Sequence, residues 1–189
     1  MKKMISLIMA LAAVALVHAG NLSSNPSFRQ QAWSRGSQEV LQPPLERGFY
    51  NLTELSSGIG LSEIEVPYSG GYGGLTTVNG YSINKSLKAG IGAGILFYNG
   101  GTVLPLYLDG RVYLGSGRLR PYLSGAGGAL FRVGGEEAST RLFANPGIGL
   151  QIPMGIRSSL SLTAGLKSQW DQDKFRDSFA TLKVGMMLW

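Results

Sequence analysis

The chain has no cysteine, a single histidine and few charged side chains. Only 15% of its 189 residues are Asp, Glu, Lys or Arg. The lack of cysteine excludes a disulfide-stapled fold, a thiolate metal site, a cysteine nucleophile and a lipid-anchored lipoprotein. The one histidine, His18, lies near the N-terminus. Glycine is the residue in excess, with 28 copies in the chain, close to twice the usual share of about 7%.

The N-terminus has the pattern of a secretory signal peptide. Lys2 and Lys3 precede an apolar run over residues 4–17, and small or apolar residues precede a cleavage point after Ala19. The run is shorter than the ~20 residues of a spanning helix. We therefore expect a cleaved signal peptide over residues 1–19 rather than an uncleaved anchor. Cleavage removes His18 and lowers Lys+Arg from 17 to 15 against 11 acidic residues, which leaves a net charge of +4.

The segment that follows differs from the rest of the chain. Residues 20–47 are polar and end just after Pro43-Pro44. We expect a periplasmic N-terminal extension here, either a flexible leader or a docking or plug segment. Beyond it no apolar stretch has the length of a membrane helix. Since only helices and closed barrels satisfy their backbone in lipid, the exported chain is either soluble or a membrane β-barrel.

From Gly48 onward, turn residues recur and the stretches between them alternate apolar and polar side chains. Residues 87–98 show this most clearly, with Leu87 and Ile91 on one face and Lys88 with three glycines on the other. A period of two predicts β-strands, and alternating glycines disfavour a helix. Eight strands are expected, at 48–61, 73–84, 87–98, 103–115, 120–132, 140–152, 156–170 and 177–189.

The expected strands are long and their connections alternate. A span of ~11–15 residues exceeds the ~5–6 of a globular strand and suits the ~9–11 of a membrane strand with overhang. Tight turns alternate with longer acidic loops, except at residues 99–102, and outer-membrane barrels have this arrangement. We expect an all-β, eight-stranded antiparallel transmembrane β-barrel over residues 48–189, with both termini periplasmic. A secreted β-sandwich is the alternative.

Two features carry a family resemblance. The final stretch, 179–189, resembles the C-terminal assembly signal of outer-membrane barrels, with Phe179, Met187 and Trp189 as its key positions. Residues 76–94, 104–111 and 120–123 resemble the small outer-membrane β-barrel family widespread in Bacteroidota, which is akin to the OmpA and OmpX type barrels. The resemblance covers about residues 48–189. It implies a place in the outer membrane of a Gram-negative bacterium, contact with its lipid, and handling by the barrel-assembly machinery.

One residue departs from the pattern of that family. Alternation places Lys183 on the same face of the last strand as Trp189. A bulge in this strand, or a strand that faces the opposite way, would explain the departure.

Charged residues recur on the polar faces of the expected strands. A charge that faces lipid at mid-depth costs about 2–4 kcal/mol, so we expect these side chains inside the barrel. They would form a salt-bridge and hydrogen-bond network or, alternatively, a narrow path that attracts anions. The expected members are Glu54, Lys88, Asp109, Arg111, Arg141, Arg157 and Lys167.

Aromatic residues gather near strand ends and in the longest loop. Tyr68 and Tyr72 in that loop are candidates for contact with a partner or a sugar. Glycines inside strands are expected where side chains of neighbouring strands need room. Girdles at the membrane interfaces are expected from Phe97, Tyr98, Tyr107, Tyr113, Tyr122, Phe131, Trp170 and Trp189.

The composition argues against catalysis. The small outer-membrane barrels that such a chain could resemble as an enzyme are of three types, namely proteases, acyltransferases or phospholipases, and deacylases. Each type relies on a histidine as general base. The mature chain is expected to have none, so we expect no catalytic residue, no metal and no cofactor. Cations spread singly over the strands also argue against nucleic acid. The expected role is a structural or interaction protein, or an accessory subunit of a larger outer-membrane complex. A narrow passive pore is the alternative, followed by a lipid-modifying enzyme.

Overall fold

The computed structural model describes residues 47–61, 70–115, 119–133, 140–155, 157–170 and 176–189. The expectation of eight strands is confirmed, and each observed bound lies within two residues of the expected one. The predicted signal peptide, and the N-terminal extension apart from its last residue, Arg47, lie outside these residues. The strands are β1 (Gly48–Gly60), β2 (Gly71–Ser82), β3 (Leu87–Tyr98), β4 (Gly101–Tyr113), β5 (Arg120–Val133), β6 (Thr140–Pro153), β7 (Ser158–Trp170) and β8 (Arg176–Leu188).

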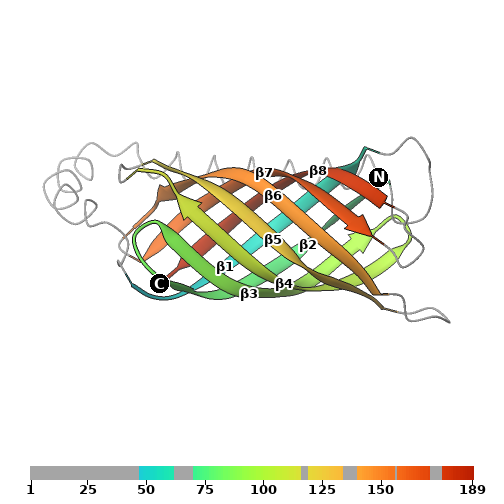
Figure 1. The fold of residues 1–189 in the computed structure, drawn as a ribbon, viewed down its shortest axis with the longest axis horizontal. Helices are drawn as coiled ribbons and strands as arrows, with labels where there is room; N and C mark the ends of the chain where they lie inside the picture. Colours follow the sequence, from blue (N-terminus) through green and yellow to red (C-terminus); the bar gives the residue numbers. More distant parts are fainter. Residues whose placement is uncertain (1–46, 62–69, 116–118, 134–139, 156, 171–175) are drawn as a thin grey trace, which may run out of the picture. The chain divides into compact units, whose positions relative to one another are not determined.

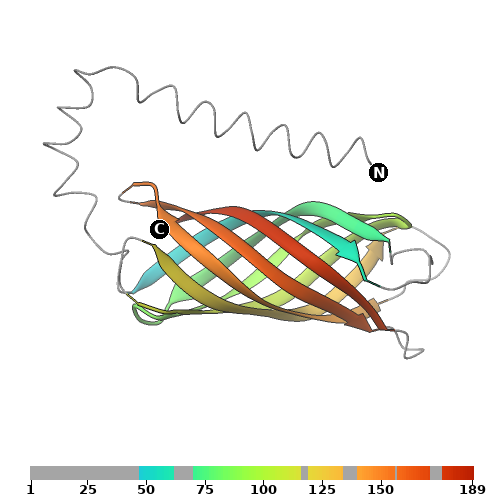
Figure 2. The ribbon, with the colours of Figure 1, turned by 90° about the horizontal axis from the view of Figure 1, so that it is seen from above.

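The strands close into one antiparallel barrel (Figures 1 and 2). Each strand pairs with the next along the chain, and β8 returns to pair with β1. The β1–β8 register runs without interruption from Asn51–Leu188 to Gly60–Phe179. Closure gives every strand a neighbour on both sides, as a sheet in lipid requires. The β-sandwich alternative is therefore wrong.

The barrel is apolar outside and largely polar inside. In β4, Leu104, Leu106 and Leu108 are 42%, 51% and 68% exposed, whereas Tyr107 and Asp109, on either side of Leu108, are buried. This polarity is the reverse of that of a soluble domain, which rarely exposes so continuous an apolar surface. Within the part of the chain that the structure describes, no helix is long and apolar enough to cross a membrane.

The two ends of the barrel have different connections. One end, here called the short-turn end, is where β2, β4 and β6 end and β3, β5 and β7 begin. At this end Asn84 Oδ1 accepts hydrogen bonds from the backbone N–H of Ser86 and Leu87, both at 2.8 Å. The other end, here called the loop end, is where β1, β3, β5 and β7 end and β2, β4, β6 and β8 begin.

Aromatic residues on the outer wall mark both ends. Phe49 and Tyr81 lie near the short-turn end with their ring centroids 5.2 Å apart. Phe97, Phe131 and Trp170 lie near the loop end, where each is between 38% and 50% exposed. Aromatic side chains prefer the two membrane–water interfaces, so these groups indicate where the apolar belt begins and ends.

The expected girdles were only partly right. Tyr98, Tyr107, Tyr113 and Tyr122 lie inside the barrel and are at most 8% exposed. Trp189 also packs against the interior cluster of apolar side chains. The expectation is wrong for these five residues because the two-residue alternation places each of them on the inward side. Position near a strand end says nothing about which face a side chain occupies.

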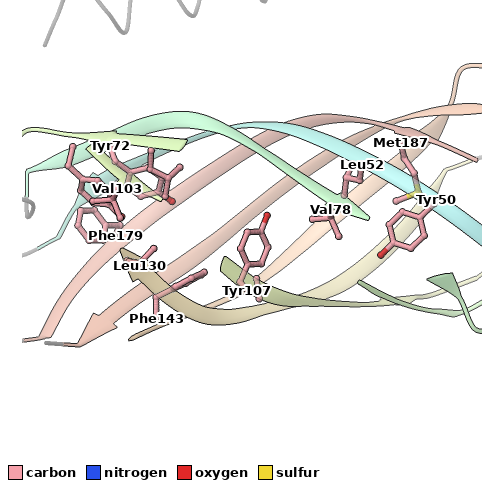
Figure 3. Close-up of a cluster of buried hydrophobic side chains, with 13 residues drawn as sticks. Tyr50, Leu52, Tyr72, Val78, Val103, Tyr107, Leu130, Phe143, Phe179 and Met187 are labelled. Carbon is pink, nitrogen blue, oxygen red and sulfur yellow. The ribbon is translucent and has the colours of Figure 1, made fainter. Parts of the chain in front are cut away.

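Apolar and aromatic side chains fill both ends of the interior (Figure 3). Toward the loop end, the Tyr72 and Tyr98 rings stack with centroids 5.0 Å apart, and the Phe179 ring meets Tyr72 edge-on at 5.5 Å. Toward the short-turn end, Leu52 and Met187 have no exposed surface. The interior is thus packed above and below its polar centre.

Glycines in the strands make room for inward rings, as expected. A Cβ added at Gly92 would overlap the Tyr107 ring, and one at Gly149 would overlap the Tyr122 ring. The glycine-rich faces are therefore a packing device of the narrow barrel, since each missing side chain is replaced by a tyrosine from a neighbouring strand.

Candidate functional site: the charged interior of the barrel

A buried arginine organises the polar centre. Arg111 Nε donates to Asp109 Oδ1 at 2.8 Å and Arg111 Nη2 donates to Glu54 Oε1 at 2.9 Å. Its Nη1 donates to Ser161 Oγ at 3.1 Å and to the Tyr122 hydroxyl at 3.3 Å. The three charged side chains are each at most 3% exposed. The guanidinium thus links four strands, β1, β4, β5 and β7, across the interior.

The alternation of β4 places this group. Tyr107, Asp109, Arg111 and Tyr113 occupy successive inward positions. Their leucine neighbours take the outer wall, where lipid would penalise any charge. Buried charges need partners to offset desolvation, and Arg111 has two carboxylates within salt-bridge distance.

A second cation lies toward the short-turn end in an aromatic cage. Lys88 Nζ lies 5.3 Å from the ring centroid of Tyr50, 5.1 Å from that of Tyr113 and 4.9 Å from that of Trp189. The Met187 sulfur lies 3.0 Å from the same nitrogen. Ring faces attract a desolvated ammonium group, so they stabilise Lys88 in the place of a carboxylate.

A third cation lies toward the loop end. Lys167 Nζ donates to the Tyr98 hydroxyl at 2.6 Å. It also lies 4.4 Å from the ring centroid of Tyr72 and 4.9 Å from that of Phe143. Lys167 and Lys183 line a cavity of about 20 Å³. Since a water needs about 10–15 Å³, the cavity has room for a water molecule but not for an organic ligand.

The lysines of the interior have no acidic partner within the part of the chain that the structure describes. Among the described residues, no carboxylate lies within salt-bridge distance of Lys88, Lys167 or Lys183. At the centre Arg111 is outnumbered by the carboxylates of Glu54 and Asp109, and the excess of positive charge in the described interior comes from the lysines and Arg120 toward its two ends. An anion would find these ends more favourable than a cation would.

The structure brings together most but not all of the expected charge network. Glu54, Asp109 and Arg111 are in direct contact, while Lys88 and Lys167 are buried in separate layers. Arg141 lies at the rim, with Nη1 3.7 Å from Asp177 Oδ2 and its side chain 26% exposed.

One expected member of the network is misplaced. Arg157 is exposed, and it lies in the turn before β7 rather than in the strand. The expected strand began at residue 156, but β7 begins at Ser158, so inward alternation does not extend to Arg157. The correction removes one cation from the interior.

One of the two candidate loop contacts is also misplaced. Tyr72 was expected in a loop, but β2 begins at Gly71, and Tyr72 is the first inward residue of that strand. Its ring is buried against Tyr98 and is not available to a partner at the surface. Tyr68 lies outside the described residues.

Two positions of the predicted assembly signal, Phe179 and Met187, share the inward face of β8, and Trp189 follows directly after the strand. Phe179 and Met187 are fully buried, and Trp189 lies partly buried behind Lys88. Lys183 is on the same inward face, and the continuous register shows that the strand faces this way without a bulge. The role of these residues in assembly stays a prediction.

Sequence reasoning missed some inward residues. Arg120 is buried with its Cζ 4.9 Å from the Tyr113 ring centroid, and its Nη2 donates to the Lys85 carbonyl. Asp177 supplies the partner of Arg141. The alternation along β5 and β8 could have identified both. In β5, for example, Arg120 and Tyr122 occupy one face and Pro121 and Leu123 the other.

The arrangement offers structural chemistry rather than an evident reaction centre. The interior groups bind one another, and among the described residues no cluster of three His, Asp or Glu side chains could hold a metal ion. What the interior can do is neutralise buried charge, exclude solvent from the centre of the barrel and attract anions at its ends.

Solved structures that resemble this chain include two small outer-membrane barrels and a designed transmembrane barrel. Neisserial surface protein A aligns with a TM-score of 0.55 and 14% identity, over 75% of this chain and 97% of that one. The N-terminal β-barrel domain of Pseudomonas aeruginosa OprF aligns with a TM-score of 0.44 and 19% identity, over 74% of this chain and 97% of that one. A de novo designed transmembrane β-barrel aligns with a TM-score of 0.43 and 13% identity, over 78% of this chain and 97% of that one.

These similarities concern the fold. No protein-family model matches the chain, and no curated protein matches it in sequence. The neisserial protein has the same kind of barrel, which agrees with the closed eight-stranded topology described above. The narrower resemblance to Bacteroidota barrels stays a prediction.

Proposed function

We propose that the chain is a non-enzymatic protein of a Gram-negative outer membrane with a structural or interaction role, including that of an accessory subunit in a larger complex. The observation that carries this proposal is the closed interior. Arg111 and its partners bridge four strands at the centre, and aromatic side chains fill the space on both sides. A barrel with a packed interior and an apolar wall acts through its surface and its loops.

Planar-bilayer recording tests this proposal directly. Purified full chain, reconstituted at high protein density, is expected to give no steady conductance above that of the lipid. A double variant, Glu54→Gln with Asp109→Asn, serves for comparison. It removes both carboxylates that pair with Arg111 and so weakens the bonding at the centre of the barrel. Steady single-channel current through the unaltered protein would contradict the closed interior.

A narrow passive pore is the second candidate, because no carboxylate among the described residues pairs with the lysines on either side of the centre. Such a pore would prefer anions. If current is seen, Lys167→Glu should shift its reversal potential in a salt gradient toward cation preference. An unchanged selectivity would place the current outside the barrel interior.

A lipid-modifying activity makes a separate prediction. Overexpression in a Gram-negative host would alter lipid A or release fatty acids if the chain were such an enzyme. We expect an unchanged lipid profile, since residues 20–189 contain no histidine that could act as general base.

The proposal places both termini in the periplasm, with the loop end outside the cell. The chain has no cysteine, so single substitutions report position cleanly. Asn99→Cys at the loop end should react with a membrane-impermeant maleimide on intact cells, whereas Lys85→Cys at the short-turn end should react only after lysis. The reverse pattern would invert the orientation.

A further inference from the structure

One area of the outer wall breaks the apolar belt. Asn51 and Thr53 on β1 and Thr77 and Asn79 on β2 all point outward, and register pairs Asn51 with Asn79 and Thr53 with Thr77. We call these four residues the polar wall patch. On β3 to β8, the outward positions nearer the short-turn end and the middle of the strands are Leu, Ile, Val, Ala, Met, Gly or Pro. Toward the loop end, single serines also face outward, at Ser57 and at the Ser168–Ser178 pair.

The patch lies within the depth of the apolar belt. The Phe49–Tyr81 aromatic pair flanks it toward the short-turn end. The Leu55–Leu75 pair, 44% and 50% exposed, flanks it toward the loop end. Because interfacial aromatics mark the edge of the hydrocarbon, residues on the loop side of Phe49 and Tyr81 face lipid tails in an isolated barrel.

The patch satisfies only part of its own hydrogen-bonding capacity. Asn51 Nδ2 donates to Thr77 Oγ1 at 3.1 Å and to Asn79 Oδ1 at 2.8 Å, and Thr53 Oγ1 donates to Asn51 Oδ1 at 3.3 Å. No acceptor among the described residues lies within bonding distance of Asn79 Nδ2, which keeps two donors. A polar group left without a partner in hydrocarbon is unfavourable.

We propose that the polar wall patch is the contact surface of a symmetric dimer, in which it meets the same patch on a second copy of this chain. The inference rests on the interaction role proposed above and names the partner. Amides and hydroxyls both donate and accept, so an uncharged patch of this kind is complementary to itself, as a two-fold contact requires. Two barrels inserted in the same direction bring these patches to the same depth.

The surroundings of the patch allow two walls to approach. On β3 the outward residue paired with Asn79 is Ile91, which is 60% exposed, and the outward residues on either side of it are Ala89 and Ala93. Small residues such as these alanines let membrane segments pack closely. Asn51 and Asn79 also line an open hollow of about 580 Å³ with Phe49. Phe49 is 82% exposed at its edge, and a two-fold contact would place this ring in the hollow of the other copy.

Cysteine cross-linking in cells tests the dimer with the full chain. Asn79→Cys is the reporter, and Leu150→Cys is the matched control. Both lie three residues from the short-turn end of their strands, and β6 lies opposite β2 in the ring of eight. After mild oxidation in the outer membrane, Asn79→Cys should give a disulfide-linked dimer and Leu150→Cys should not.

A second variant separates the dimer from folding. Asn51→Leu with Asn79→Leu makes the patch as apolar as the rest of the belt, so the barrel should still insert and keep its shifted gel mobility before boiling. Losing the interfacial hydrogen bonds should lower the dimer fraction in detergent about tenfold, as measured by mass photometry.

Each other outcome overturns the inference. Equal cross-linking at both positions means random collision, and no cross-link means that lipid covers the patch. A cross-link from Asn79→Cys to a different protein would overturn the second copy while leaving the interaction role intact. Failure of the interaction role itself would show as steady conductance, so the two failures are distinguishable.

Discussion

Replacing Arg111 with methionine tests whether the interior is held together by its buried charge network. Met has a similar stem but no charge, so the change leaves Glu54 and Asp109 buried without the cation that both contact, at 2.9 and 2.8 Å. Removing one partner of a buried ion pair costs about 3–5 kcal/mol. We expect the free energy of unfolding of Arg111→Met to fall by about that amount.

The assay is urea unfolding of the refolded barrel in lipid vesicles, followed by tryptophan fluorescence and by the gel shift on boiling. Arg157→Met is the matched control, because Arg157 lies exposed in a turn and should leave the midpoint unchanged. Adding Glu54→Gln and Asp109→Asn to Arg111→Met removes the stranded charges and should recover much of the loss. A midpoint for Arg111→Met equal to that of Arg157→Met would refute the reasoning.

Three further changes probe other parts of the interior by the same unfolding assay. Gly128→Ala should destabilise the barrel by about 1–3 kcal/mol, because the new Cβ would overlap the Leu106 carbonyl oxygen. Gly125→Ala is the control and should be neutral, because its Cβ meets nothing within 4 Å. Equal effects of the two substitutions would contradict this account. Lys167→Met should change stability by only about 1 kcal/mol, because no carboxylate is left stranded; a loss as large as that of Arg111→Met would overturn the distinction. Trp189→Ala should slow folding into vesicles while Trp189→Phe restores it, and an unchanged rate for both would remove the predicted assembly role.

Much of the fold could be predicted because a barrel strand carries a simple signal. Lipid outside and a polar interior force a period of two, which residues 103–113 show almost without exception. Strand ends were harder, since turn residues can continue the alternation for a residue or two. The late start of β7 and the early start of β2 account for the misplacement of Arg157 and Tyr72.

The partners of the inward residues could not be predicted. Arg111 contacts Glu54 and Ser161, which lie 57 and 50 residues away in sequence. Which inward residues meet across a barrel depends on the stagger between strands, and that stagger follows from pairing along the whole wall. Alternation alone gives the face of each side chain but not the height at which it crosses the interior.

The outward polar residues show a different limit. Asn51 and Asn79 carry no charge, and each is unremarkable in the sequence of its own strand. Their significance comes from register, which places the two amides side by side on a wall that is apolar elsewhere. A pairwise reading of neighbouring strands is needed to find such a patch.

The central claim is that lipid covers one face of every strand while the other face closes a packed interior. Site-directed spin labels, introduced singly through cysteine along residues 103–113 of β4, test it most directly in reconstituted vesicles. Accessibility to oxygen should alternate with a period of two, high at Leu104, Leu106 and Leu108 and low at Tyr107 and Asp109. Uniform accessibility to a water-soluble relaxation agent along the whole strand would contradict the account.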